Sequence, residues 1–438
     1  MSLITLRSRA SGQPQPAPGP HWASLTTIPR RWLAVAFAVC GIYAIGVALF
    51  THNDLHRLWG IAAACGYLLA AAVAVAWRSC RGLDAALILG LIGTLLVPLG
   101  WLAAQGRQQP EVSVITRSAQ LMIHHGSPYQ STAALAAAHM AYNYDPYLPV
   151  MTLFGVPRAL GGLHVLTDPR IWFGVVFVVA FGLALKVAGA RSWLRWTAFV
   201  TASPVIAFEL AVGGTDIPVL ALMCLGLALL WGRPFARPSG VGSHPLLGGL
   251  VLGVDAAMKA TAWPLLVIGF VLLAVRDGKR ATVTFTVAAL AACAALAGPF
   301  AALWPGSLVV NTISYPLGLT KSVSPAASPL PGHLLADTGH IGHMIAVGLL
   351  VLAGLAIAVW LVVSPPRNVP AATWRLILGL TLMFTLAPAT RFGYYIYPGG
   401  LLVWLFIAIA GRRAQAAGSR AVPPGTAGPD PAPAPAGT

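Results

Sequence analysis

Long apolar stretches alternate with short polar segments along most of this chain. The stretches are long enough to cross a bilayer as helices, since its hydrocarbon core requires about 20 apolar residues. The pattern predicts an all-α, polytopic membrane protein of roughly 10–12 transmembrane helices. We expect spans near 31–50, 58–77, 84–104, 170–187, 196–212, 216–231, 282–304, 342–363, 374–389 and 393–410.

The apolar run 246–275 departs from this pattern because Lys259 and Pro264 interrupt it. Basic residues flank both of its ends, so we expect two short helices in a hairpin whose tip points toward the opposite face. Asp255 and Lys259 are four residues apart and would meet on one helical face, which makes an ion pair between them one interpretation. A contact of Lys259 with a ligand phosphate is the other.

Two polar segments, 105–169 and 305–341, are too long to be simple connections. Within the first, apolar and polar side chains separate onto opposite faces of a helix at 111–123, which predicts an amphipathic helix at the membrane interface. Pro110 suits its start, Glu111 its positive dipole end and Gly126 its stop. The short apolar stretch 147–162 contains two prolines and predicts a half-inserted segment, with a complete span as the alternative.

Composition supports the membrane assignment and gives it an orientation. The chain is 57% hydrophobic and 9% charged, whereas soluble proteins carry about 25% charged residues. Its net charge of +16 comes mostly from Lys and Arg between the apolar runs, as the positive-inside rule predicts. We therefore expect a multi-pass plasma-membrane protein with cytoplasmic termini and external loops at 105–169 and 305–341. Nucleic acid is not expected as a partner.

These patterns divide the chain into three parts. Residues 29–410 form a single transmembrane domain, and the polar tail 1–28 and the Pro/Ala-rich tail 411–438 are expected to be disordered in the cytoplasm. The five cysteines form no CxxC pair and have no zinc-ligand spacing, so no metal site is expected.

Several ionisable residues, Glu209 among them, fall near the predicted external side, where charge at membrane depth usually has a function. Lysine and arginine can hold a phosphate, and a carboxylate can take the proton of an attacking hydroxyl. Each candidate also has a structural alternative. Glu111 and Asp216 could cap helices, Asp145 in Tyr144-Asp-Pro-Tyr147 could form a turn, and the tyrosines could form an interfacial belt rather than contact sugar.

The order of motifs resembles glycosyltransferase family 87 of the GT-C superfamily, which includes actinobacterial polyprenyl-phosphomannose-dependent α-mannosyltransferases. An acidic residue, Glu111, precedes the amphipathic helix, which ends in Gly126-Ser-Pro-Tyr129 and leads to Tyr144-Asp-Pro-Tyr147. The stretch Ala257-Met-Lys259 through Pro264 resembles the family's Ala-x-Lys-x-x-Pro, with a longer gap before the proline. The similarity covers about 84–410. Two features depart from the family pattern: Glu111 stands where the family has Asp, and its loop follows the third span rather than the first.

The resemblance implies a GT-C-like, inverting hexosyltransferase that moves a hexose, mannose being favoured, from a polyprenyl-phosphate sugar. The acceptor would be a lipid, glycan or protein of the cell envelope on the outer face, and no cofactor is implied. By the same resemblance Glu111 is the base and Lys259 and Arg391 bind the donor phosphate. Secondary site residues would be Asp216, Asp145, His333, Tyr129 and Arg117. A lipid-linked sugar flippase or transporter, or an inactive family member, is the alternative.

Overall fold

The computed structural model describes residues 28–138, 140–162, 164–232, 243–322 and 324–420. Within these ranges the chain is helical and contains no strand beyond a single β-bridge between Ala327 and Thr390. Eight helices are long and apolar enough to cross a membrane, which confirms the predicted all-α polytopic fold. Those eight segments are 30–50, 54–76, 80–104, 169–187, 278–303, 340–363, 369–386 and 392–417.

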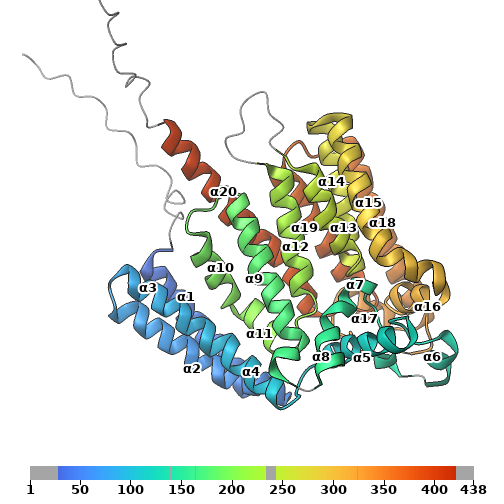
Figure 1. The fold of residues 1–438 in the computed structure, drawn as a ribbon, viewed down its shortest axis with the longest axis horizontal. Coiled ribbons are helices and arrows are strands. Elements are labelled where there is room, and N and C mark those ends of the chain that lie inside the picture. Colours follow the sequence, from blue (N-terminus) through green and yellow to red (C-terminus); the bar gives the residue numbers. More distant parts are fainter. Residues whose placement is uncertain (1–27, 139, 163, 233–242, 323, 421–438) are drawn as a thin grey trace, which may run out of the picture.

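The N-terminal helices form one layer of the bundle (Figure 1). Helix α1 (Arg30–Phe50) packs along α2 (Asp54–Ala76), and α3 (Cys80–Leu91) passes through a π-helical turn into α4 (Val97–Ala104). Two glycines make the close approach of α2 to this turn possible. A Cβ built on Gly66 would lie 2.7 Å from the Cα of Gly93, so neither position has room for a side chain.

The centre of the bundle is α12 (Ile217–Trp231), most of whose residues are buried. It packs against α9 (Pro169–Val187) and α13 (Pro245–Ala256), and α13 packs in turn against α15 (Gly278–Leu303). Helix α14 (Trp263–Arg276) completes the predicted hairpin with α13. The bundle ends with α18 (His340–Val363), α19 (Val369–Leu386) and α20 (Ile396–Arg420), so the last helix continues past residue 410, where the tail was expected to begin.

The expected single span at 196–212 is wrong. The structure has two shorter helices there, α10 (Trp193–Thr201) and α11 (Pro204–Val212). Ser203 between them is extended, with φ −65° and ψ 149°. Pro204 explains the break, because proline lacks an amide donor and disfavours helical backbone at the residue before it.

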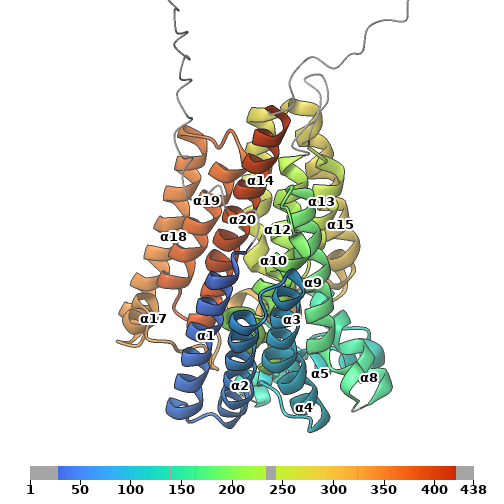
Figure 2. The same cartoon turned by 90° about the vertical axis from the view of Figure 1, so that its left-hand side faces the viewer.

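Both long polar segments fold at one end of the bundle. The first contains α5 (Pro110–His125), α6 (Thr132–Ala138), α7 (Pro149–Thr152) and α8 (Val156–Gly161), and the second contains α16 (Pro305–Val309) and α17 (Pro331–Ala336). In both views α5, α8 and α17 lie low, whereas α20 ends at the top (Figure 1 and Figure 2). The stretch 147–162 forms only short helices and does not span, so the alternative of a complete span is wrong.

Candidate functional site

A cavity of about 450 Å³ opens where the two polar segments meet the ends of the helices. Residues from distant parts of the chain line it, including α2, α5, α11 and both polar segments. Its charged and polar lining comprises His56, Gln109, Glu111, Tyr142, Tyr144, Tyr147, Glu209, Thr215, Asp216, Lys259, Tyr315, Ser324, Ser328, Arg391 and Tyr394. Three carboxylates and two basic side chains therefore face one space.

Glu111 reaches this cavity from the first turn of α5. The helix begins at Pro110 and ends at Gly126, whose φ of 74° is left-handed, so the predicted amphipathic helix and its boundaries are confirmed. The Glu111 side chain forms an ion pair with Arg391 and does not cap the helix. Its second oxygen, Oε2, is buried without a hydrogen-bond partner in the described structure.

Arg391 is held in place by a contact between the second polar segment and the end of α19. The amide of Ser328 donates to the Thr390 carbonyl over 2.9 Å, and the Thr390 amide donates to Ala326 over 2.8 Å. The Thr390 hydroxyl also donates to the Phe384 carbonyl over 2.7 Å. These bonds fix the backbone directly before Arg391. The guanidinium that pairs with Glu111 is therefore attached to a well-held segment.

Lys259 enters the cavity from the tip of the α13–α14 hairpin. Its Nζ forms an ion pair with Asp216 and lies 5.4 Å from the ring centre of Tyr147 and 5.1 Å from that of Tyr394. Asp216 also accepts a hydrogen bond of 2.7 Å from the Tyr397 hydroxyl. Two aromatic faces and a carboxylate stabilise the ammonium group, which makes it a preorganised cation.

The predicted pairing of Asp255 with Lys259 is wrong. Helix α13 ends at Ala256, and Lys259 has extended backbone with φ −155° and ψ 139°, so the two side chains do not share a helical face. Asp255 is fully buried, and neither of its oxygens has a hydrogen-bond partner in the described structure. The suggestion that Asp216 caps α12 is also wrong, because its carboxylate makes no capping bond.

The family model of glycosyltransferase family 87 matches residues 146–388, more than half of the chain. The chain belongs to glycosyltransferase family 87. A search of curated proteins found no match to it. The family assignment makes the protein a membrane glycosyltransferase. The matched residues include Asp216 and Lys259, whereas Glu111 and Arg391 lie outside them, so the place of this second pair in the site rests on the geometry alone.

Three other predicted residues of this glycosyltransferase lie behind the cavity wall rather than in it. Asp145 is buried and accepts hydrogen bonds from the Ser118 hydroxyl over 2.6 Å and the Tyr147 amide over 2.9 Å, which is the predicted turn. The Tyr129 hydroxyl donates to the Tyr147 carbonyl over 2.9 Å. Arg117 donates to the Asn143 carbonyl over 3.2 Å. All three groups hold the segment that carries Tyr144 and Tyr147.

Burial also changes the acidity of Asp145. Loss of solvent raises the pKa of its carboxyl from the ordinary 3.8 to about 6, although the bonds from Ser118 and Tyr147 and the nearby charge of Arg117 act in the opposite direction. Desolvation is the largest effect because it penalises the charged form. A carboxyl group in this state suits a structural role in the wall.

His333 lies in a different place, in a smaller cavity of about 250 Å³ formed by the second polar segment and the end of α19. Its Nδ1 is 2.9 Å from the Pro388 carbonyl oxygen. The two cavities share Ser324 and Ala326, so His333 is a neighbour of the main site. In the described residues no three His, Cys, Asp or Glu side chains come together as a potential metal site.

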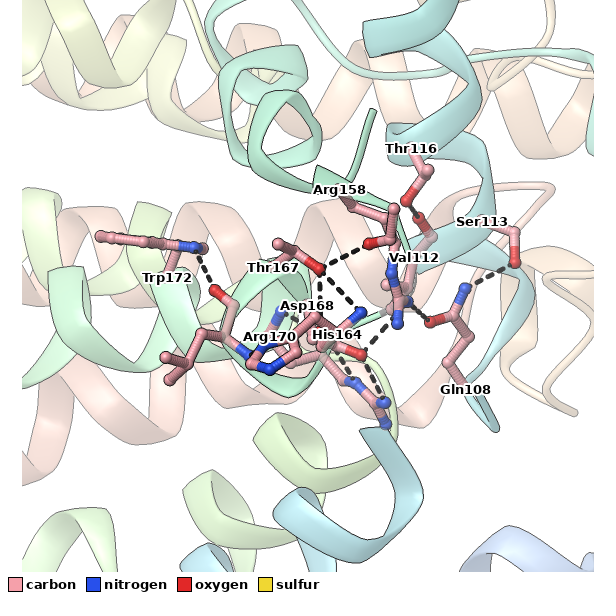
Figure 3. A network of polar contacts seen from close by, with 12 residues as sticks. Gln108, Val112, Ser113, Thr116, Arg158, His164, Thr167, Asp168, Arg170 and Trp172 are labelled. Carbon is pink, nitrogen blue, oxygen red and sulfur yellow. Dashed lines mark hydrogen bonds and ion pairs between the residues drawn. The ribbon is translucent and has the colours of Figure 1, made fainter. Parts of the chain in front are cut away.

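A buried network that the sequence did not reveal positions the start of α5 (Figure 3). Asp168 receives two bonds of 2.9 Å from the Arg170 side chain and a third, longer contact of 3.2 Å from Arg158. Arg158 donates over 2.7 Å to Gln108, whose amide nitrogen donates over 2.9 Å to Ser113. Gln108 and Ser113 lie on either side of Glu111 in the chain, so the network holds the segment that carries it. Its sequence signal was Asp168-Pro-Arg170, which is also an ordinary helix start.

Sequence reasoning also passed over His56 and Tyr397, and it gave Glu209 no specific role. His56 lies in α2, outside the stretch that resembles the family, yet its ring faces the cavity and is 3.2 Å from the side-chain nitrogen of Gln109. Tyr397 follows Tyr394 and Tyr395 in the first turn of α20, and its hydroxyl donates a hydrogen bond to Asp216. Glu209 lines the cavity from α11 and was recognised only as one of several acidic residues near the external side.

Proposed function

We propose that this family 87 glycosyltransferase transfers a hexose, mannose being favoured, from a polyprenyl-phosphate sugar to a lipid, glycan or protein acceptor of the cell envelope. The observation that carries the proposal is the meeting of Glu111–Arg391 and Lys259–Asp216 in one cavity at the end of a membrane bundle. A donor with a lipid tail can stay in the bilayer while its phosphate and sugar enter this cavity.

The two cations suit the donor phosphate. Arg391 offers a planar set of donors that matches phosphate geometry, and Lys259 offers a point charge held between aromatic rings. When phosphate takes over part of the Arg391 guanidinium, the Glu111 carboxylate loses a partner and becomes available. The phosphate leaves as a stable anion, so these cations stabilise the charge that develops and no strong acid is required.

Glu111 then acts as the general base. It accepts the proton of the acceptor hydroxyl while the hydroxyl oxygen forms a bond to the anomeric carbon and the bond from that carbon to the phosphate oxygen breaks. The attack is in line with the leaving phosphate, so the anomeric configuration inverts. Glu111 lines the cavity and its Oε2 has no hydrogen-bond partner in the described structure, which supports this role because that oxygen can receive a proton without breaking an existing bond.

The outer face of the plasma membrane is the proposed location of the reaction. Arg276 ends α14, Lys279 and Arg280 lie in the first turn of α15, and Arg412 and Arg413 lie in the last part of α20, whose end is remote from the cavity. By the positive-inside rule this basic end belongs in the cytoplasm, with both termini. The cavity then faces outward, away from cytoplasmic nucleotide sugars.

The direct test uses purified protein in lipid nanodiscs with an envelope lipid extract as acceptor. Radiolabelled polyprenyl-phosphate hexoses and the corresponding nucleotide hexoses are supplied in parallel, and the release of polyprenyl phosphate and labelled product is measured. We expect transfer from the lipid-phosphate donors alone. Transfer from nucleotide sugars alone would refute the proposed donor class.

A further inference from the structure

The three carboxylates in the cavity differ in their partners. Glu111 is paired with Arg391 and Asp216 with Lys259. The side-chain carboxylate of Glu209, in contrast, forms no hydrogen bond or ion pair with any residue that the structure describes, although Glu209 is half-buried and lines the same space. An unpaired carboxylate in a partly desolvated cavity is costly unless a ligand satisfies it.

The backbone around Glu209 is fixed, so its side chain has a defined direction. The last turn of α11 binds its neighbours on both sides: the Ala211 carbonyl accepts from Arg170 over 2.6 Å, and the Val212 carbonyl accepts from Gln109 over 2.8 Å. A Cβ built on Gly393 would lie 3.2 Å from Oε1 of Glu209. The carboxylate therefore occupies space that only a glycine at 393 leaves free.

Charge decides which part of the donor can meet this group. Glu209 is close enough to Arg391 and Lys259 to interact with both charges, but it also feels the negative charges of Asp216 and Glu111. A donor phosphate would be repelled by Glu209 and attracted by the two cations. The sugar that is transferred is bonded directly to the phosphate. It is therefore the part of the donor that can contact Glu209 while the phosphate contacts the two cations.

Carboxylates and aromatic rings together suit a sugar. A carboxylate accepts from hydroxyl groups, and its two oxygens can hold two neighbouring hydroxyls. Phe208 and Tyr394 line the cavity beside Glu209 and Gly393, respectively, so aromatic surface borders the same space as the carboxylate. Resting on the proposed function, we infer that Glu209 is a specificity-determining residue that binds hydroxyl groups of the transferred hexose.

The test is a thermodynamic cycle in which the protein carboxylate and single sugar hydroxyls are removed separately and together. Wild-type protein and Glu209→Ala are assayed with a polyprenyl-phosphate hexose and its 2-, 3-, 4- and 6-deoxy analogues. For the wild type we expect at least one deoxy donor to lose about 100-fold in kcat/KM, because the missing hydroxyl leaves the half-buried carboxylate without its partner. In Glu209→Ala the parent donor should fall by a similar factor, and the same deoxy donor should then match the parent within about fivefold.

Two further variants sharpen the result. Gly393→Ala keeps the charge of Glu209 but crowds its Oε1, so it should weaken the same discrimination to an intermediate degree. Asp84→Asn changes a carboxylate that pairs with Arg195 on α10, remote from the cavity lining, and should keep the wild-type pattern. If Glu209→Ala has no measurable turnover, competition of unlabelled deoxy and parent donors for binding gives the same ratio.

The outcomes separate this inference from the proposed function. If wild-type protein transfers sugar from no lipid-phosphate donor, the proposed function fails and the inference fails with it. If wild-type protein transfers sugar but Glu209→Ala preserves the full penalty for every deoxy donor, only the inference is overturned. A uniform loss on all donors with unchanged discrimination would also overturn it.

Discussion

At the scale of single residues, each of the two cations in the cavity is paired with a carboxylate, and the proposed function requires the donor phosphate to take over part of that pairing. Lys259 contacts Asp216, whose other partner is Tyr397, and lies between the rings of Tyr147 and Tyr394. If Lys259 binds the donor phosphate, removing its charge leaves the fold largely intact and weakens the donor complex.

Lys259→Met should therefore raise the Kd for a polyprenyl-phosphate sugar by about 10- to 100-fold, the effect of losing one charge-assisted hydrogen bond. The measurement is donor binding to purified protein, with thermal unfolding as the control for folding. If the only role of Lys259 is to neutralise Asp216, then Asp216→Asn combined with Lys259→Met should restore donor affinity to the wild-type value. Such a rescue would contradict phosphate binding by Lys259.

Asp145 gives a prediction for pH. Its folded-state pKa of about 6 exceeds the ordinary 3.8, so between these values the folded protein keeps a proton that the unfolded chain releases. The contribution of this proton to stability is complete at low pH and is lost as pH rises through the window from about 4 to 6. Asp145→Asn removes the titration, and it retains both an acceptor for the Tyr147 amide and a donor toward Ser118.

The difference in unfolding temperature between Asp145→Asn and wild type should therefore shift in favour of the variant as pH rises from about 4 to 7. The change corresponds to roughly 2 kcal/mol. Thermal unfolding in detergent at several pH values measures it. A difference that stays constant across this range would show that Asp145 is ionised in the folded protein at every pH tested.

At the scale of elements, the Asp168 network holds the short helices α7 and α8 against the start of α5. Asp168 and Arg170 have fully buried side chains, and that of Arg158 is 4% exposed. Two guanidinium groups depend on one carboxylate, so neutralising that carboxylate leaves buried positive charge without a partner.

Asp168→Asn should destabilise the protein by about 3–5 kcal/mol, the usual cost of breaking a buried ion pair. Asp84→Asn is the matched control, because Asp84 also pairs with an arginine but is 47% exposed and should cost about 1 kcal/mol or less. Thermal unfolding of both variants in the same detergent compares them. Equal losses would mean that the buried network adds nothing beyond a surface pair.

The sequence could predict elements better than contacts between them. The apolar and polar faces of 111–123, with Pro110 and Gly126 at the ends, were enough for α5, and Lys259 with Pro264 was enough for the α13–α14 hairpin. Partners four residues apart are visible in a sequence, which is why an ion pair between Lys259 and Asp255 was one of the two interpretations. The actual partner, Asp216, comes from another helix and required the fold.

The same limit applies to the site as a whole. Glu111 and Arg391 were recognised as separate candidates, but nothing in a single sequence joins residues that are 280 positions apart. Asp168 was missed because Asp before Pro is an ordinary helix start, and its ion pairs become apparent only when Arg158 and Arg170 lie beside it. Local patterns thus predicted which charged residues lie near the external side. Tertiary packing determined which of them face one cavity.

At the scale of the whole molecule, orientation can be tested with one introduced and one native cysteine. Ser131 is exposed in the first polar segment, and Cys80 is exposed at the start of α3, beyond the end of α2 that is remote from the cavity. In a background where the other cysteines are replaced, Ser131→Cys should react with a membrane-impermeant thiol reagent on intact cells. Cys80 should react only after lysis. The reverse pattern would place the cavity in the cytoplasm.

The central claim is that a hydroxyl deprotonated by Glu111 attacks a sugar carried on a lipid phosphate. Its most direct test is the turnover of a polyprenyl-phosphate hexose by wild-type protein and Glu111→Gln in the same nanodiscs. Glutamine keeps the size and hydrogen bonding of Glu111 but cannot accept the proton, and general-base assistance contributes about 10²–10⁴-fold in rate. We predict that turnover by Glu111→Gln falls at least about a hundredfold while donor binding changes little. Turnover near the wild-type rate would contradict the account, because Glu111 would then be only a partner for Arg391 and another group would take the proton.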